Sequence, residues 1–132
     1  HADENFYVDS VYDQVYKGYA LEKRHPRLAE AVDATTGEVV TWTNPATGET
    51  KIAITPYFSS SDGRTRSWSE VWGGDVAWAK SVPVPHDQGK QLLGHGVGMS
   101  ARGALLMVEE DGKTYDEVLL YFFTGIVIQD RY

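Results

Sequence analysis

The sequence contains no cysteine. That absence excludes disulfide bonds, zinc sites built from thiolates and catalysis by a thiol nucleophile. It leaves the redox compartment open, because a chain without thiols gives no sign of whether its surroundings are oxidising or reducing.

Positive charge is also scarce. The 132 residues include 12 Lys and Arg against 19 Asp and Glu, a formal net charge of -7, without a block of like charge. Proteins that bind a phosphate backbone carry a basic stripe, so we expect no nucleic-acid partner. No apolar run approaches the roughly eighteen residues of a membrane-spanning helix, so we expect no transmembrane segment in this chain.

The composition that remains is that of a globular domain. Hydrophobic residues make up 42% of the sequence and charged residues 23%, and the length suits one domain. There is no internal repeat, low-complexity tract or linker. We therefore expect a single domain over residues 1–132.

Strand and helix patterns are mixed along the chain. β-Branched and aromatic runs predict strands at residues 7–19 and 126–128 and a hairpin at about residues 38–58. Helical spacing and capping residues predict helices within residues 25–37, at about 101–110 and at about 115–123, with a short helical turn at 67–74. Because these elements lack βαβ regularity, we predict an α+β fold with a mixed or antiparallel sheet.

The stretch GHGVGMS, from Gly94 to Ser100, places three glycines around one histidine. Glycines at 94, 96 and 98 leave the backbone bare beside His95, so a ligand or another chain segment could approach closely. The helix that follows offers free N–H groups to acceptor oxygens. The structural alternative is a tight loop feeding a capped helix, with His95 bonded to a neighbouring carbonyl.

The stretch SSSDGRT, from Ser59 to Thr65, leaves a predicted strand. Its hydroxyls could bind the hydroxyls of a ligand, and Arg64 could bind a carboxylate. The structural alternative is an ordinary turn at Asp62 and Gly63, solvated by the serines.

Glu70 lies between two tryptophans, where apolar surroundings could raise a carboxyl pKa and favour a catalytic acid. Ser67 precedes it by three residues, however, which is the spacing of a capping box, and we favour that structural role. Trp68, Trp72 and Trp78 could stack on sugar rings, although we expect at least one of them in the core.

Other catalytic and metal-binding patterns are weak. The histidines, at positions 1, 25, 86 and 95, show no paired ligand spacing, and Asp9 with Asp13 has no third ligand in view. A Ser-His-Asp triad lacks a nucleophile motif that would mark its serine. We therefore expect no metal site.

Six stretches occur in order between Tyr7 and Gly125: QVYKG, AVDATTGEVV, YFSSSDGRT, EVWGG, SVPVP and GHGVGMSARGALLM with DGKTYDEVLLYFFTG. Together they resemble the SpoIID/LytB family of bacterial cell-wall proteins, and GHGVGMS is the most specific of them. The resemblance implies that peptidoglycan glycan strands are the partner and that the chain acts outside the cytoplasm, in the bacterial cell envelope or secreted.

Three functions are compatible with that resemblance. Members similar to the sporulation protein are lytic transglycosylases, in which one carboxylic acid protonates the glycosidic oxygen and then assists the 6-hydroxyl in forming a 1,6-anhydro end. LytB-type members are enhancers of a cell-wall amidase, so the chain could instead be a non-catalytic glycan-binding module. A structural scaffold in a sporulation or division complex is the third alternative.

The chain departs from the family pattern in two places, so two of the family's functional sites are not expected in it. The family's catalytic glutamate belongs to a segment upstream of QVY, and nothing in this chain matches it. We therefore expect the chain to be the C-terminal part of the domain, lacking its N-terminal segment, with the acid upstream. Many members also hold zinc through a Cys-x-x-x-His-Cys motif, which is replaced here by Val8, Tyr12 and Asp13.

The resemblance makes GHGVGMS one wall of a glycan groove and SSSDGRT the opposite wall, while Glu70 stays structural. No catalytic residue, cofactor or metal is assigned. The expected substrate-binding residues are Ser59, Ser60, Ser61, Arg64, Thr65, Trp72, Gly94, His95, Gly96, Gly98 and Ser100.

Overall fold

The computed structural model describes residues 23–130. The chain divides into two compact units, His1–Gly37 and Glu38–Tyr132. The strand predicted at residues 7–19 lies outside the described residues, and so do the three positions of the replaced zinc motif.

The first unit contributes helix α2 (Pro26–Ala34) to the described residues. Pro26 stands in its first turn, where its fixed φ suits the helix and its missing N–H costs no hydrogen bond. The hydroxyl of Thr35 donates to the carbonyl of Ala31 at 2.9 Å and helps to end the helix. Gly37 follows with a φ of 88°. The predicted helix is confirmed, although it ends three residues before Gly37.

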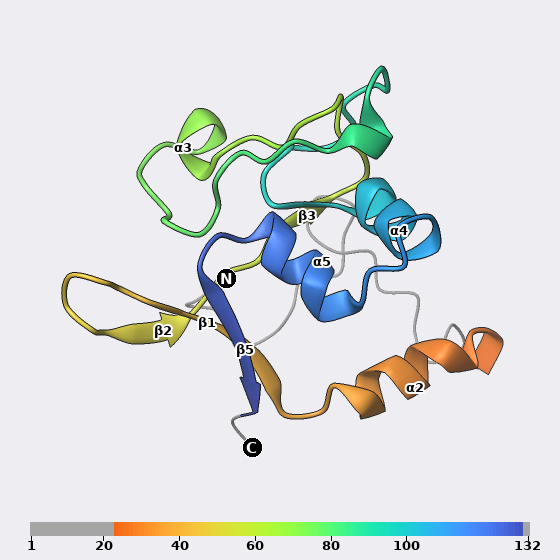
Figure 1. Ribbon diagram of the computed structural model, residues 1–132, viewed down its shortest axis with the longest axis horizontal. Coiled ribbons are helices and arrows are strands. Elements are labelled where there is room, and N and C mark those ends of the chain that lie inside the picture. The colour runs from red at the N-terminus through yellow and green to blue at the C-terminus, as the bar shows by residue number, and fades with distance from the viewer. Residues whose placement is uncertain (1–22, 131–132) are drawn as a thin grey trace. The chain divides into compact units, whose positions relative to one another are not determined.

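The second unit contains a three-stranded antiparallel sheet (Figure 1), in the order β2-β1-β5. Its strands are β1 (Glu38–Thr43), β2 (Thr50–Ile52) and β5 (Ile126–Asp130). β1 is central, with Thr41 opposite Ile52 on one side and Val127 on the other. With the helices described below, this gives an α+β fold with an antiparallel sheet, as predicted.

The hairpin is shorter than predicted. Asn44 begins the turn, where its side chain accepts from the N–H of Ala46 at 2.9 Å, and Gly48 supplies a φ of 73°. The second arm ends at Ile52 and not at Phe58, and Pro56, which has no N–H to donate to a ladder, lies between them. Residues beyond Pro56 form β3 (Tyr57–Phe58), which pairs in parallel with β4 (Met99–Ser100) in a separate sheet.

Three helices of the second unit begin at capping side chains: α3 (Trp68–Val71), α4 (Ala101–Glu109) and α5 (Tyr115–Phe122). The 3₁₀ turn η1 (Pro85–Asp87) begins after Val84, which provides no side-chain cap. The hydroxyl of Ser100 accepts from the N–H of Gly103 at 3.2 Å, and the Glu117 carboxylate accepts from the N–H of Thr114 at 3.0 Å. Both predicted C-terminal helices are confirmed, each one residue shorter than expected.

The hydrophobic core of the second unit lies between its helices, loops and sheet. Its buried members are Ala53, Trp78, Ala79, Val84, Val97, Met107, Val118, Phe122, Phe123 and Ile126. Trp78 is 7% exposed and donates its indole N–H to the carbonyl of Ile54 at 2.8 Å, so the prediction of a core tryptophan is confirmed. In residues 23–130, no helix has the length and apolar character to cross a membrane.

Candidate functional site

The segments SSSDGRT and GHGVGMS are direct neighbours. Ser60 forms an antiparallel bridge with Leu93, and Arg66 forms a parallel bridge with Val97. The N–H of Arg66 also donates to the carbonyl of Gly96 at 2.7 Å. These bridges at the edges of the two segments place them side by side, and their assignment as opposite walls of a glycan groove stays a prediction.

The three glycines of GHGVGMS are required by the chain itself. Gly94, Gly96 and Gly98 have φ values of 108°, 81° and 80°, a region that favours glycine. A Cβ at Gly98 would lie 2.1 Å from the carbonyl oxygen of Pro56, and one at Gly94 would lie 2.8 Å from Cβ of Phe58. Gly96 and Gly98 are buried. The close approach that the glycine spacing indicated is made by a neighbouring segment.

His95 is hydrogen-bonded inside this loop. Its Nδ1 accepts from the N–H of Val97 at 3.0 Å, so the proton of the neutral ring resides on Nε2. Burial lowers the pKa of His95, partly offset by a hydrogen bond with the backbone of Tyr57. This favours the neutral ring, which lies tilted against Phe58 and Trp72 at centroid distances of 5.7 Å and 4.8 Å.

Phe58, Trp68, Trp72 and His95 form an aromatic cluster. Trp68 meets Trp72 edge to face at 4.6 Å, and Trp72 in turn lies against His95. Short helix α3 positions both tryptophans, because Trp68 is its first residue and Trp72 is its C-cap, followed by Gly73 with a φ of 74°. Trp72 remains 45% exposed. The cluster thus holds one indole ring in place while leaving part of it open to solvent.

Arg64 binds a carboxylate, but that carboxylate belongs to Glu70. Its Nη2 lies 3.0 Å from Oε1 of Glu70, and its Nη1 donates to Ser81 and to the carbonyl of Thr65. Glu70 also accepts from the N–H of Ser67 at 2.7 Å, so the predicted capping box is confirmed. Arg64 and then Ser67 lower the pKa of Glu70 to about 2. Glu70 is therefore ionised at neutral pH and has no proton to donate.

A buried carboxylate, Asp87, ties the two segments together. Its Oδ2 accepts from the hydroxyls of Ser61 and Ser100 at 2.9 Å and 2.6 Å, and its Oδ1 accepts from Arg102 at 2.9 Å. Burial raises the pKa of Asp87, but these hydrogen bonds, with one from the N–H of Ser61, outweigh it and leave the pKa lowered. Asp87, Ser61 and Ser100 are all 0% exposed.

Several predicted site residues are therefore internal. Ser60 donates to the carbonyl of Gln91 at 3.0 Å, and the hydroxyl of Thr65 accepts from the N–H of Val82 at 2.9 Å. Both side chains are buried, as are Ser61 and Ser100. Of the predicted residues, Ser59, Arg64, Trp72 and Gly94 are exposed, and His95 is half-buried.

One depression adjoins the predicted residues. It has a volume of about 480 Å³ and is lined by Asp62, Gly63, Arg64, Pro83, Pro85 and Gln88. Asp62 pairs with Arg66 at 2.7 Å, and that hydrogen bond lowers the pKa of Asp62. Asp62 and Arg66 thus balance each other's charge, and Glu70 balances the charge of Arg64.

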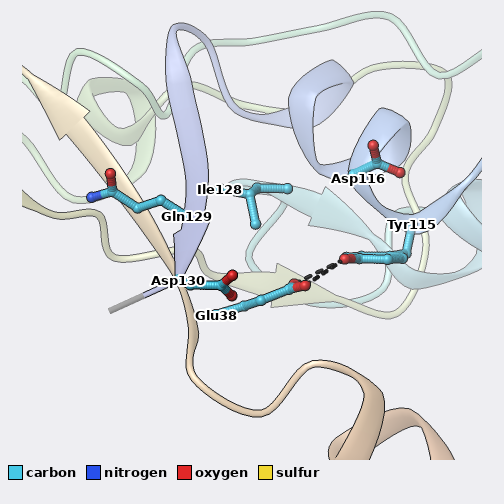
Figure 2. A pocket seen from close by; sticks show the side chains of 6 residues that line it. All are labelled: Glu38, Tyr115, Asp116, Ile128, Gln129 and Asp130. Atoms are coloured by element: carbon cyan, nitrogen blue, oxygen red, sulfur yellow. Dashed lines mark hydrogen bonds between the residues drawn. The ribbon is translucent and has the colours of Figure 1, made fainter. Parts of the chain in front are cut away.

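A second, acidic pocket was not predicted (Figure 2). Its volume is about 250 Å³, and its lining is Glu38, Tyr115, Asp116, Ile128, Gln129 and Asp130. The hydroxyl of Tyr115 donates to both carboxylate oxygens of Glu38 at 2.9 Å, and this raises the pKa of Tyr115. Within residues 23–130, no group of three His, Asp or Glu side chains is arranged to hold a metal ion.

No protein-family model matches this chain, and no curated protein matches it either. The resemblance to the SpoIID/LytB family therefore remains a prediction from the motifs.

Proposed function

We propose that this chain is a glycan-binding module of the SpoIID/LytB type, which binds peptidoglycan glycan strands in the bacterial cell envelope. The observation that carries the proposal is the exposed ring of Trp72, held between Trp68 and His95. Sugar rings present apolar C–H faces that stack on aromatic rings. A ring already fixed by its neighbours loses little side-chain entropy when a sugar binds.

Polar groups on the neighbouring SSSDGRT segment suit hydroxyls more than charge. Ser59 is exposed on the SSSDGRT segment, and Arg64 already shares its guanidinium with Glu70. A saccharide that bound here would therefore exchange hydrogen bonds with an ion pair and hydroxyls, while Trp72 supplied the apolar contact. Such recognition depends on sugar shape and needs no free cation.

The carboxyls near the cluster favour binding over cleavage by this part of the chain. A general acid at neutral pH needs a raised pKa, whereas those of Glu70 and Asp62 are lowered by arginine partners. Asp87 is buried and fully engaged. In the lytic transglycosylase alternative, the proton donor would be the glutamate that we expect upstream. In the amidase-enhancer alternative, no proton donor is needed.

Titration of peptide-free glycan strands tests the proposal. Wild-type chain should bind, and Trp72→Ala should weaken binding by about tenfold, the loss of one stacking contact. Trp72→Phe keeps an aromatic ring and should retain most of the affinity. Tyr115→Ala removes an equally exposed aromatic ring from the acidic pocket and should bind like wild type.

Mass spectrometry of the same mixtures separates binding from cleavage. No 1,6-anhydro ends should form with this chain alone. Absence of glycan binding by the wild-type chain, or unchanged binding by Trp72→Ala, would refute the proposed site. Accumulating 1,6-anhydro ends would show that this chain contains the acid.

A further inference from the structure

Helices α4 and α5 contact each other in the second unit (Figure 1). An apolar groove lies between them. Its volume is about 410 Å³. Its lining residues are Met99, Ala101, Ala104, Leu105, Val108, Tyr115, Val118 and Leu119. Apart from the phenol of Tyr115 and the sulfur of Met99, these side chains are hydrocarbon.

The lining residues follow helical spacing on both sides. On α4 they stand at positions 101, 104, 105 and 108, and on α5 at positions 115, 118 and 119. Such a stripe normally packs against another element. Here Leu105, Val108 and Tyr115 are 54%, 47% and 51% exposed. Two small residues, Ala101 and Ala104, leave room for side chains from outside.

The end of the groove where α4 leads into α5 carries more acidic than basic side chains, even though His86 pairs with Glu110 and Asp111, and Lys113 with Glu117. From Gly103 to Asp130 the sequence contains one basic residue, Lys113, and it contains the acids Glu109, Glu110, Asp111, Asp116, Glu117 and Asp130. Glu109 directly follows the lining residue Val108, and Asp116 directly follows Tyr115. A ligand that fills the groove therefore meets an apolar floor and negative charge at one end.

We propose that this groove binds an amphipathic helix of a partner protein, with large apolar residues on one face and lysine or arginine beside them. The helix would place its apolar residues, spaced i, i+3, i+4 and i+7, between α4 and α5. Its cations would lie near Glu109 and Asp116. The inference does not depend on glycan binding by the aromatic cluster.

Charge selects this occupant over two others. A second copy of the chain would bring its own acidic residues against the acidic end of the groove, and like charges facing each other oppose association. An anionic membrane surface would be repelled for the same reason. A basic helix satisfies both the apolar groove and the acidic end.

The experiment uses the whole chain and two labelled model peptides in fluorescence anisotropy. Both peptides are amphipathic helices with leucines at i, i+3, i+4 and i+7; one carries lysines beside the leucines and the other carries glutamates. The lysine peptide should bind, more weakly as salt concentration rises. The glutamate peptide should bind at least about tenfold more weakly.

A pair of matched variants locates the site. Leu105→Ser removes an apolar side chain that lines the groove, and it should weaken binding of the lysine peptide by at least about tenfold. Leu120→Ser removes a leucine that is 50% exposed on α5 but does not line the groove, and it should leave binding unchanged. Both leucines are exposed, so thermal melts should show both variants folded.

Three results would overturn the proposal. Equal affinity for the two peptides would remove the role of charge. Unchanged affinity in Leu105→Ser would place the peptide elsewhere. A Leu105-dependent dimer in sedimentation velocity, with no peptide binding, would make a second copy the occupant.

Discussion

The carbonyl oxygen of Pro56 occupies the place where a side chain at position 98 would begin, only 2.1 Å from an ideal Cβ. The same oxygen accepts the N–H of Met99 at 3.0 Å, which brings β4 beside β3. Gly98 therefore fixes both a backbone conformation and the contact between two strands. A methyl group there would have to displace a backbone and not a flexible side chain.

Gly98→Ala should lower the free energy of unfolding by about 3 kcal/mol or more, because a positive φ and a clash with a backbone atom add together. Gly112→Ala is the matched control. Gly112 has a φ of 67° but no atom within 4 Å of an added Cβ. Gly112→Ala should therefore lower the free energy of unfolding by only about 1–2 kcal/mol. Urea denaturation measures both values. Equal losses in the two variants would mean that the Pro56 contact is unimportant.

The sequence predicted part of this residue-level arrangement. Glycine spacing around His95 indicated a close approach, but not whether a ligand or a chain segment makes it. The segment that does so, at Pro56, is forty-two residues away from Gly98, and no local pattern records that distance. Asp87 was missed for a similar reason. Its neighbours in the sequence do not show that Ser61 and Ser100 converge on it.

At the level of elements, the end of α4 carries an ionic contact with η1. Nε2 of His86 lies 2.9 Å from Oδ2 of Asp111, and its Nδ1 lies 3.3 Å from Oε2 of Glu110. The Asp111 hydrogen bond raises the pKa of His86, and Glu110 adds to the effect, whereas burial and nearby Arg102 oppose it. When protonated, the imidazole thus links the residues just after α4 to the turn that contains Asp87.

His86→Gln should destabilise the protein more at about pH 5.5 than at about pH 8.5. A raised folded-state pKa contributes stability that is complete below the unfolded value of 6.5 and disappears as pH rises through the folded-state pKa. Melting temperatures of both proteins at the two pH values check this. An equal difference at both would show that the charge on His86 does not matter.

The pKa of His95 is shifted in the opposite direction from that of His86. Burial lowers its pKa, so its contribution is present above 6.5 and is lost as pH falls through the folded-state pKa. The pH dependence of the wild-type chain alone therefore mixes the two histidines. The comparison with His86→Gln isolates one of them, because His95 is common to both proteins.

Local elements were easier to predict than their pairing. The capping residues Ser100 and Thr114 mark α4 and α5, and the turn at Asn44 marks the β1–β2 hairpin. The two-residue strands β3 and β4 are too short to show alternation, and their partners are distant in the sequence. The predicted hairpin was too long because a β-rich composition continues to Phe58, whereas Tyr57–Phe58 pairs with β4 and not with β1.

At the scale of the molecule, the described hydrophobic core belongs to the second unit. Its buried members all lie between Ala53 and Ile126, and the described helix of the first unit, α2, has no buried residue. The four tryptophans, at positions 42, 68, 72 and 78, also lie in the second unit. Tryptophan fluorescence therefore reports on that unit alone.

A fragment of residues Glu38–Tyr132 should unfold in one cooperative transition in urea, because it contains this core and the whole sheet. A peptide of residues 23–37 is the companion measurement, and it should show little helix by circular dichroism, since isolated helices this short are marginal in water. A gradual, non-cooperative loss of tryptophan signal from the fragment would contradict the expectation.

The pairing of β1 with β5 joins the first and last elements of the second unit, with Glu38 opposite Asp130 and Trp42 opposite Ile126. During synthesis, β1 leaves the ribosome while α3, α4 and α5 are still to be made. One edge of β1 stays open until β5 arrives, and open strand edges pair readily with other chains. A chain stopped just before Ile126 would carry every residue of the Asp87 network and still expose that edge, so the risk of aggregation through β1 lasts until Ile126–Asp130 has been made.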